Sequence, residues 1–383
     1  GIGIVGSIYA VFGGLKAVAI SDSINAIGLL IGGVLIPVFG LIMIGDGSVL
    51  DGLSTLTTEN PDKFKSMGGS TDPVPFYTIF TGMMLVQLFY WGTNQQIIQR
   101  ALGAKDLKEG QKGLLLASFI KILGPIIVVL PGLIAYHLFE GKLETADSAY
   151  PMLVKEVLPN AWVGFFAAVL FGAILSSFNS VLNSSVTLFG IDIYKQHINK
   201  DADEKTVVKY GKTFGVILAI AAMFIAPLIA NAGSLFDYLQ EINGIYSIPI
   251  FSIIIVGYLT KYVPAIAAKI GLVSGCVLYI ISQFFMQPYF VNSALDAAKA
   301  SGVTDEATLA LVEVQAYPHF LDIMAILFVL NVIIMLVIGK IKPRKEAFVQ
   351  EYTKQVDITP WKYTKQVGIA ICAIVIGVYI YFA

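Results

Sequence analysis

Charged residues are scarce in this sequence. Asp, Glu, Lys and Arg make up 13% of its 383 residues, whereas about 25% is typical of soluble globular domains. Apolar residues make up 56%, and the mean hydropathy is +0.78. The composition therefore excludes an ordinary soluble domain and predicts a polytopic membrane protein.

Other chemistries lack the residues that they need. The two cysteines, Cys276 and Cys372, lie in apolar segments, so they imply neither a disulfide framework nor a metal site. The three histidines are scattered and indicate neither a zinc site nor a catalytic triad. The net charge is −1 and there is no long basic run, so nothing indicates a nucleic-acid partner.

The sequence does not begin with methionine, and its opening GIGIVGSIYAVFGG is too short to span a bilayer. We expect this stretch to be the end of a helix that starts earlier, which would make the chain an N-terminally truncated fragment. Apolar runs long enough to cross about 30 Å of hydrocarbon then predict nine full spans and one partial one. The nine runs are 17–45, 76–98, 113–138, 161–190, 208–232, 240–259, 263–286, 319–340 and 363–382. A surface helix is expected at 296–315, within an external loop.

Lys and Arg orient these spans, because cytoplasmic loops retain basic residues. With Lys16 in the cytoplasm and strict alternation, most of the 25 basic residues fall in cytoplasmic loops and helix ends. The external loops hold only Lys63, Lys65, Lys142, Lys155 and Lys299. This topology predicts an extracytoplasmic C-terminus and leaves one cation, Lys121, inside span 113–138.

Three polar features in the predicted spans call for an explanation. Lys121 either faces a cavity or a partner, or snorkels toward the cytoplasm. Asp22 is either an ion-coupling acid or an acid in the first turns of a helix near the interface. A polar stripe (Ser176, Ser180, Asn183 and Thr187, with Ser177 and Ser184 adjoining) either packs helices together or, at Ser176–Ser177 with a freed Ala173 carbonyl, offers hard oxygen ligands to a small cation.

The segment DYLQEINGIYSIPI (237–250) is a further polar cluster, with Gln240, Glu241 and Asn243 beside Gly244 and Pro249. Gly and Pro can interrupt a helix where it lines a cavity, which frees backbone groups for a ligand. Alternatively, Gln240 and Glu241 lie in the external headgroup zone.

Five blocks resemble the solute:sodium symporters in content and order, most closely the bacterial sodium/glucose and sodium/galactose cotransporters. They are GGLKAVAISDSIN (13–25), FYWGTNQQIIQRALGAK (89–105), SFIKILGP (118–125), AILSSFNSVLNSS (173–185) and FDYLQEINGIYS (236–247). The resemblance implies an all-α, LeuT-type inverted-repeat fold in a single transmembrane transporter domain. Residues 1–45 would end the first five-helix repeat, 76–259 would form the second, and 263–383 would be peripheral helices.

The resemblance also implies site residues. Tyr90, followed by Trp91, matches an aromatic gate that stacks on the sugar from the cytoplasmic side. Lys121 and Gln240 match positions that hydrogen-bond sugar hydroxyls, and Gln87 stands at a sugar-contacting position where the galactose transporter has asparagine. Asn94 belongs to the polar set that would line a midplane cavity, and Gly92 would permit local unwinding there.

For sodium, the resemblance implies ligands at Ala173, Ser176 and Ser177, and an acid near the ion's exit at Asp22. Relatives with a second sodium have serine where this chain has Ala173, so a second ion is not expected, and no other cofactor is implied. The family's Trp-Thr-Asp-x-x-Gln block is Ile-Ser-Asp-Ser-Ile-Asn here (20–25). The first core helix, which normally contributes to both sites, is not in this sequence.

The implied function is import of a glucose- or galactose-like sugar across the cell's inner (plasma) membrane, driven by sodium through alternating access. The implied partners are the sodium ion, the sugar and the lipid bilayer. One alternative keeps the fold and changes the solute to myo-inositol or a sugar acid. A remote alternative is an intramembrane enzyme that uses Lys121 and the serines, although no enzyme is expected. A channel is disfavoured because no ring of charges or repeated filter sequence is present.

Overall fold

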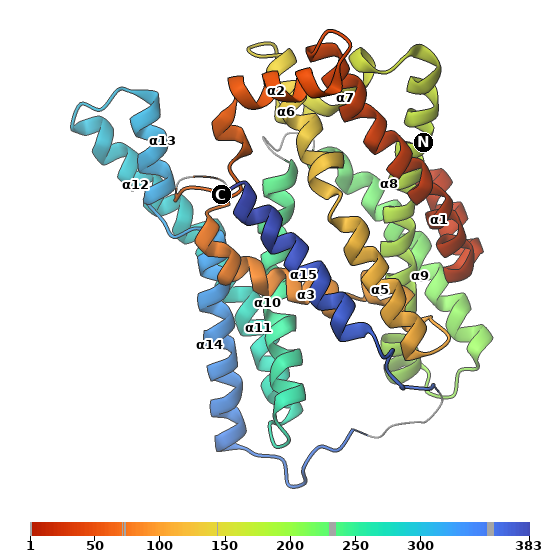
Figure 1. Ribbon diagram of the computed structural model, residues 1–383. Helices are drawn as coiled ribbons and strands as arrows, with labels where there is room; N and C mark the ends of the chain where they lie inside the picture. Colours follow the sequence, from red (N-terminus) through yellow and green to blue (C-terminus); the bar gives the residue numbers. More distant parts are fainter. Residues whose placement is uncertain (1, 71, 73, 144, 230–234, 351–355) are drawn as a thin grey trace. The chain divides into compact units, whose positions relative to one another are not determined.

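The computed structural model (Figure 1) describes residues 2–70, 72, 74–143, 145–229, 235–350 and 356–383, with side chains from residue 19 onward except at 229–237. Every regular element in these ranges is a helix, as the sequence predicts. The helices form two compact units that interleave along the chain. Unit 1 comprises residues 1–65, 95–235 and 357–382, and unit 2 comprises 66–94 and 236–356 with residue 383.

Unit 1 is built on two long helices, α1 (Ile2–Ile44) and α8 (Asn160–Leu188). They run antiparallel and very close together (Figure 1), because glycines in each helix receive side chains of the other. Gly32 receives the Phe166 ring, and a Cβ at Gly28 would lie 2.8 Å from Val169. Small residues that allow close backbone approach are a common basis of helix association in membranes.

The continuity of α1 corrects the expected separation between a partial helix and the span 17–45. A single helix covers both. Only Gly13–Gly14 weakens the helix between them, at a cost of about 1 kcal/mol each relative to alanine, and no proline or polar loop ends it. The side chain of Lys16, on which the predicted orientation depends, lies outside the described residues, as does Lys354. The orientation therefore stays a prediction.

The predicted span 113–138 is a bent pair of helices. α5 (Leu107–Lys121) and the segment Pro125–Leu138 meet at an angle of 41°. That second segment begins as the π-helix η3 (Pro125–Val129) and continues as α6 (Leu130–Leu138). Pro125 has no backbone N–H to donate to the Lys121 carbonyl four residues earlier, and its ring crowds that carbonyl, which accounts for the break at the end of α5.

The remaining helices of unit 1 complete its core and its ends. α2 (Val49–Glu59), η1 (Pro61–Phe64), η4 (Ala146–Ser148) and α7 (Ala149–Val157) close one end around buried residues that include Ile36, Leu56, Ile134, Leu153 and Phe166. Beyond α8 the chain continues through the π-helix η5 (Phe189–Ile198), α9 (Glu204–Ile225) and η6 (Ala226–Ile229). The last helix, α15 (Thr364–Tyr381), packs on α5.

Side chains cap several of these helices in the loops. Asp203 precedes α9 and accepts a hydrogen bond from the Thr206 N–H at 3.1 Å, as an N-cap residue should. Hydrogen bonds from the Thr206 side chain and backbone lower the pKa of Asp203.

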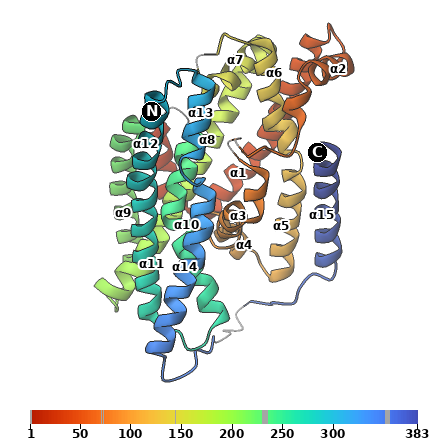
Figure 2. The same cartoon turned by 90° about the vertical axis from the view of Figure 1, so that its left-hand side faces the viewer.

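Unit 2 combines the first part of the 76–98 segment with the helices after residue 235. η2 (Phe76–Phe80) and α3 (Gly82–Gly92) pack near α14 (Phe320–Ile341), where Gly82 meets the Leu321 carbonyl. α10 (Leu235–Leu259), α11 (Ala265–Ile280) and α14 run side by side (Figure 2). The core that these three helices share with α3 includes Val86, Ile248, Tyr279, Leu321 and Met324.

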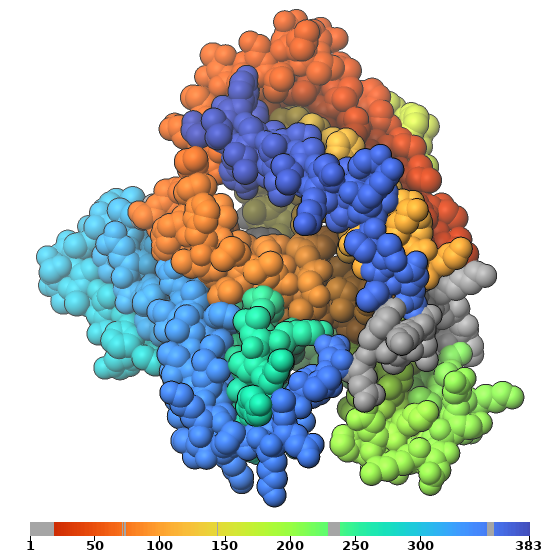
Figure 3. Space-filling model, turned by 60° about the horizontal axis from the view of Figure 1, so that its bottom comes forward, coloured from red at the N-terminus to blue at the C-terminus, as the bar shows by residue number. Residues whose placement is uncertain are grey.

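The loops at one end of these helices are joined by backbone hydrogen bonds. The Arg344 N–H donates to the Tyr262 carbonyl at 2.9 Å, and the Phe348 N–H donates to the Lys261 carbonyl at 2.8 Å. The turn after α10 and the segment after α14 consequently lie together on the face shown in Figure 3.

The expected surface helix at 296–315 is two helices instead. After α11, the π-helix η7 (Ile281–Met286) leads into α12 (Gln287–Ala300), and α13 (Glu306–Gln315) follows a short turn. Gly302 in this turn has a φ of +90°, which ends α12 in a left-handed conformation that favours glycine. Asp305 then starts α13 by accepting the Thr308 N–H at 2.9 Å.

Among the described residues, seven helical segments are long and apolar enough to cross a membrane, and the bent pair of α5 and Pro125–Leu138 makes eight. The one predicted span that remains, 76–98, is divided between α3 and α4 (Gln95–Leu102). Each of these helices is too short to cross a membrane alone. The chain is therefore a multi-pass membrane protein, and the predicted span 76–98 is not a single helix in it.

Candidate functional site

The break between α3 and α4 occurs where the sequence predicts local unwinding. α3 ends at Gly92, α4 begins at Gln95, and Thr93–Asn94 joins them. The Phe89 carbonyl accepts from the Thr93 N–H, the Asn94 N–H and the Thr93 hydroxyl, at 2.9, 3.1 and 2.8 Å. Three donors on one carbonyl end the helix without leaving those groups unsatisfied. Broken helices at membrane depth are typical of transporter binding sites.

The last turn of α3 presents an aromatic pair beside an amide. The Tyr90 and Trp91 rings meet edge to face with centroids 5.2 Å apart. The Trp91 indole N–H donates to the Gln87 Oε1 at 2.9 Å, which fixes the Gln87 side chain along the helix. Trp91 and Gln87 are exposed and Tyr90 is half-buried, so these groups are accessible within unit 2.

The α10 segment that carries Gln240, Glu241 and Asn243 corrects one expectation. Gly244 and Pro249 do not interrupt the helix, which is continuous from Leu235 to Leu259. Neighbouring side chains explain this: the Tyr279 ring occupies the space over Gly244, and Pro249 packs against Gly275 of α11. The Tyr246 hydroxyl donates to the Asn243 Oδ1, and the Phe89 and Tyr246 rings meet edge to face at 6.0 Å.

Lys121 is the last residue of α5, directly before the bend at 122–124. Its side chain is exposed on unit 1. A cation in the last turn of a helix is favoured by the partial negative charge of the unpaired carbonyls there. The bend therefore supplies a local reason for a lysine at this depth, beside the cavity and snorkelling interpretations.

The predicted sodium ligands lie on α8. This helix is unbroken from Asn160 to Leu188, so the Ala173 carbonyl lies within a regular helix. Ser177 is exposed and Ser176 half-buried. The Ser176 carbonyl accepts the Ser180 hydroxyl at 2.6 Å. Nothing in the structure tests whether Ala173, Ser176 and Ser177 bind sodium, so that role stays a prediction.

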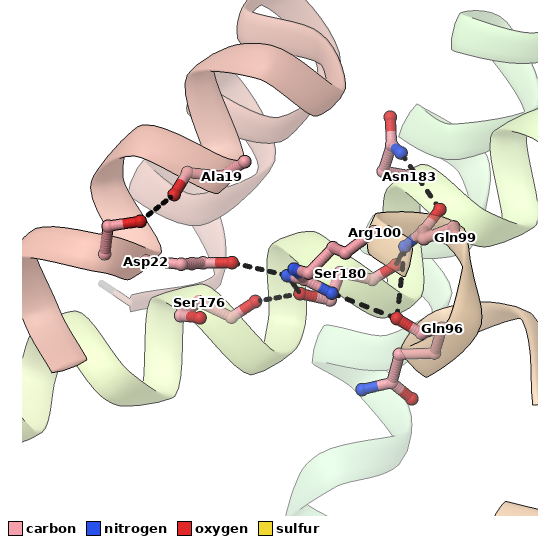
Figure 4. Close-up of polar contacts among 9 residues, drawn as sticks. Ala19, Asp22, Gln96, Gln99, Arg100, Ser176, Ser180 and Asn183 are labelled. Atoms are coloured by element: carbon pink, nitrogen blue, oxygen red, sulfur yellow. Dashed lines mark hydrogen bonds and ion pairs between the residues drawn. The ribbon is translucent and has the colours of Figure 1, made fainter. Parts of the chain in front are cut away.

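Asp22 forms an ion pair that the sequence does not reveal. The Arg100 Nη2 of α4 donates to both the Asp22 Oδ2 of α1 and the Ser180 Oγ of α8, while its Nη1 donates to the Gln96 carbonyl at 3.0 Å (Figure 4). The side chains of Asp22 and Arg100 are 19% and 32% exposed. One guanidinium thus joins three helices.

Gln99 extends this polar junction. Its Nε2 donates to the Ser180 carbonyl and its Oε1 accepts from the Asn183 Nδ2, both at 3.3 Å (Figure 4). Two members of the polar stripe, Ser180 and Asn183, therefore bind α4. This supports the helix-packing interpretation for that half of the stripe.

Arg100 and Gln99 are the residues that sequence reasoning missed. Arg100 counts as a cytoplasmic cation in the topology, which hides its ion pair. A signal was present, since Gln95–Gln99 and Gln96–Arg100 each place two polar residues on one helix face at i,i+4 spacing. Asn179 was also missed: it is 2% exposed, and its Oδ1 has no hydrogen-bond partner among the described residues.

The predicted site residues divide between the two units. Gln87, Tyr90, Trp91, Asn94 and Gln240 belong to unit 2. Lys121, Ala173, Ser176, Ser177 and Asp22 belong to unit 1. Within unit 1, Asp22 and the Ser176 carbonyl are linked by a chain of hydrogen bonds. Arg100 donates to both Asp22 and the Ser180 hydroxyl, and the Ser180 hydroxyl donates to the Ser176 carbonyl.

Comparison with known proteins agrees with this architecture. A model of the sodium:solute symporter family matches residues 2–275. The chain is 45% identical over 379 residues, 99% of its length, to the uncharacterized symporter YidK of Escherichia coli, and covers 61% of that protein. It is 33% identical over 307 residues, 74% of its length, to the sodium/glucose cotransporter of Vibrio parahaemolyticus, and covers 56% of that protein.

Two further similarities bear on solute and fold. A sodium/myo-inositol cotransporter 2 of Bos taurus is 30% identical over 319 residues, which are 74% of this chain and 47% of that protein. The solved structure of a Na⁺-coupled sialic acid symporter matches with a TM-score of 0.59 at 17% identity, over 90% of this chain and 67% of that one. This structural match confirms the LeuT-type transporter fold that the sequence blocks imply.

Proposed function

Because this chain belongs to the sodium:solute symporter family, we propose that the protein of which it forms part imports a neutral sugar or a similar polyol with sodium. The observation that carries the proposal is the break in the helix at Thr93–Asn94, directly after the turn of α3 that presents Gln87, Tyr90 and Trp91. An aromatic face beside an amide suits a pyranose, whose ring stacks while its hydroxyls accept and donate hydrogen bonds.

The engagement of Arg100 favours a neutral solute over a sugar acid. A free carboxylate on the solute calls for an accessible arginine, since bidentate guanidinium pairing is the common means of recognising carboxylates. The Arg100 guanidinium already donates hydrogen bonds to the Asp22 carboxylate, the Ser180 hydroxyl and the Gln96 carbonyl. The similarity to a sodium/myo-inositol cotransporter keeps a polyol as the second candidate solute.

Sodium is proposed as the coupling ion, with oxygen ligands from Ala173, Ser176 and Ser177 and with Asp22 near its exit. Ser177 supports the assignment because its hydroxyl is exposed on α8. The chain spans 61% and 56% of the length of two relatives, so ligands from outside residues 1–383 belong to this proposal as well. One sodium per solute is expected, since Ala173 has no side-chain oxygen.

The deciding experiment is uptake by the full-length protein in proteoliposomes. The panel consists of labelled D-glucose, D-galactose, myo-inositol and D-glucuronate, each with an inward sodium gradient and with choline in its place. The proposal expects sodium-dependent accumulation of a neutral sugar or of myo-inositol, and no accumulation of D-glucuronate. Sodium-dependent uptake of D-glucuronate alone would overturn the assignment of a neutral solute.

Tyr90 provides the sharpest test of the solute contact. Tyr90→Phe keeps the aromatic face and loses one hydroxyl, worth about 0.5–1.5 kcal/mol, so uptake should fall but remain measurable. Tyr90→Ala should abolish accumulation, because the stacking surface and the gate are lost together. Solute affinity measured per folded molecule is the readout, and normal affinity in Tyr90→Ala would return Tyr90 to a packing role.

A further inference from the structure

The polar segment of α10 is held by a residue of α11, a helix that the family resemblance places among the peripheral helices. The Tyr279 hydroxyl donates to the Glu241 carbonyl at 3.0 Å, between Gln240 and Asn243. Tyr279 is 1% exposed. A tyrosine hydroxyl buried this deeply needs a hydrogen-bond partner, and in the described part of the chain that partner is the Glu241 carbonyl.

The contact depends on a glycine. A Cβ at Gly244 would clash with Cζ and Oη of Tyr279 and with the Met324 side chain. The Tyr279 ring therefore lies directly over the α10 backbone, one turn after Gln240. No other residue type at position 244 leaves room for it.

Pro249 explains why α10 needs such a contact. A proline inside a helix cannot donate to the carbonyl four residues earlier, here Ile245, and its ring crowds that carbonyl. The turn between Ile245 and Pro249 is consequently the weakest in α10. The residues before it, including Gln240, Glu241 and Asn243, depend on contacts outside the helix for their orientation.

α10 is anchored on both sides of this weak turn. After it, the Asn331 Nδ2 of α14 donates to the Ser252 Oγ at 3.2 Å. Before it, Tyr279 holds Glu241 and Gly244. Gly271, Gly275 and Tyr279 lie on one buried face of α11, with Pro249 packed against Gly275, so a single helix face supports the turn itself and the segment before it.

We propose that Tyr279 is a positioning residue for solute binding, which fixes the orientation of the α10 segment 240–243 through the Glu241 carbonyl. The inference rests on the proposed function, in which Gln240 contacts the solute. It gives a helix outside the implied ten-helix core a role in solute affinity, through the segment that it positions.

The test compares two variants that each lose one tyrosine hydroxyl in unit 2. Tyr279→Phe removes the bond to Glu241 and keeps the ring over Gly244. Tyr317→Phe is the matched control: it removes a 2.8 Å hydrogen bond between Tyr317 and Ser282 that does not involve α10. Both are made in the full-length protein, and uptake uses whichever of D-glucose, D-galactose or myo-inositol the wild type accumulates.

Tyr279→Phe should raise the KM for that solute about three- to tenfold, the range for losing one well-placed hydrogen bond. Vmax and the sodium concentration for half-maximal uptake should stay unchanged in Tyr279→Phe. In Tyr317→Phe, the solute KM should stay unchanged as well. In a double-mutant cycle that combines Tyr279→Phe with Gln240→Ala, the two increases in solute KM should be less than additive in free energy. The reason is that Tyr279 acts through the segment that Gln240 occupies. Equal solute KM in the two tyrosine variants would overturn the proposal, and so would additive effects if Gln240→Ala itself raises the solute KM.

A second measurement does not depend on transport. Amide hydrogen exchange of residues 238–246 in the purified protein should be faster in Tyr279→Phe than in the wild type or in Tyr317→Phe. Unchanged exchange in this segment would refute the positioning role even if no solute were transported. Faster exchange with normal solute affinity in Gln240→Ala would support the positioning of the segment and remove Gln240 from the proposed solute contacts.

Discussion

At the scale of single residues, the Asp22–Arg100 ion pair stands out because it joins helices that are distant in the sequence. Ionisable groups within membrane proteins are usually paired, since an isolated charge in hydrocarbon is costly. Here the carboxylate comes from α1 and the guanidinium from α4, and Ser180 of α8 shares the same nitrogen. The pair accounts for an acid in the first predicted span and for an arginine at the end of the broken one.

Asp22→Asn should lower the thermal stability of the full-length protein. The change removes the negative charge that pairs with the Arg100 guanidinium, which is then left with neutral acceptors such as the Ser180 hydroxyl and the Gln96 carbonyl. A hydrogen bond between charged groups is worth about 1.5–3 kcal/mol. The partial exposure of both side chains reduces this to about 1–2 kcal/mol. The melting temperature of the detergent-solubilised protein measures this loss of stability.

The control for this prediction is the Asp62–Lys65 pair, whose side chains are 82% and 63% exposed. Asp62→Asn should leave the melting temperature unchanged, because water screens an exposed pair. In the double variant Asp22→Asn with Arg100→Gln, much of the lost stability should return, since no unpaired charge remains. A melting temperature in Asp22→Asn equal to that in Asp62→Asn would show that the ion pair contributes nothing.

Ser177 offers a second prediction at this scale. Ser177→Ala should raise the sodium concentration for half-maximal uptake several-fold, while solute affinity at saturating sodium changes little. The hydroxyl would be an ion ligand, and the solute would feel its loss only through linkage between the two sites. Ser185→Ala is the matched control, because Ser185 lies two turns later on α8 and its hydroxyl bonds the Val181 carbonyl. Identical sodium dependence in the two variants would argue against a sodium site at Ser177.

At the scale of elements, the break between α3 and α4 depends on Gly92. A Cβ at Gly92 meets nothing within 4 Å, so alanine fits sterically. Alanine also favours helix by about 1 kcal/mol relative to glycine. Gly92→Ala should therefore extend α3 toward Asn94 and reduce the maximal rate of uptake several-fold, without loss of folded protein.

Gly132→Ala is the control for Gly92→Ala. Gly132 lies inside α6, and a Cβ there also meets nothing within 4 Å. The same substitution in an unbroken helix should leave transport unchanged or slightly stabilise the protein. If the two variants transport at equal rates, flexibility at Gly92 plays no part in the transport cycle.

The polar contact among α10, α11 and α14 gives a further prediction for elements. Asn331 is 1% exposed, donates to Ser252 of α10 and accepts from Ser274 of α11 at 3.2 Å. Asn331→Leu removes both hydrogen bonds, each worth about 0.6–1.7 kcal/mol between membrane helices. The free energy of unfolding should fall by about 1–3 kcal/mol on this basis. Asn183→Leu, which loses one longer hydrogen bond to Gln99, should cost less.

The sequence predicted the helices better than their ends. Within the described residues, apolar length located each helix that is long enough to span a membrane, and Gly92 indicated the break between α3 and α4. Gly244 and Pro249 were misleading as interruptions, because the contacts that keep α10 continuous come from Tyr279 and Gly275, more than twenty-five residues away. Propensity describes a segment by itself, whereas tertiary packing decides whether a weak turn stays helical.

At the scale of the whole chain, the division into repeats stays a prediction, and the two compact units are a separate feature of the fold. Unit 2 takes α3 from the start of the predicted second repeat and joins it to α10 and to the helices after it. The residues predicted for solute and sodium are correspondingly shared between the units. The family resemblance supplied most of those residues, and their roles stay predictions.

The ion pair of Asp22 and Arg100 could not be predicted, because it joins residues 78 positions apart. Nothing in the local sequence distinguishes Arg100 from a cation at the membrane surface. Topology rules assign each cation to a side of the membrane, and they are silent on which cations form pairs inside a unit. The same limit applies to Tyr279, whose partner lies 38 residues earlier.

The π-helical segments η3, η5 and η7 have a consequence for comparing this chain with its relatives. A π-helical turn is equivalent to an α-helical turn that has gained one residue. Loss of a single residue within Pro125–Val129, Phe189–Ile198 or Ile281–Met286 can therefore be absorbed as a return to α-helix, with the flanking faces kept in register. In an α-helical stretch the same deletion turns everything beyond it by about 100°. One-residue gaps in an alignment of these spans thus belong at the three π-helical segments.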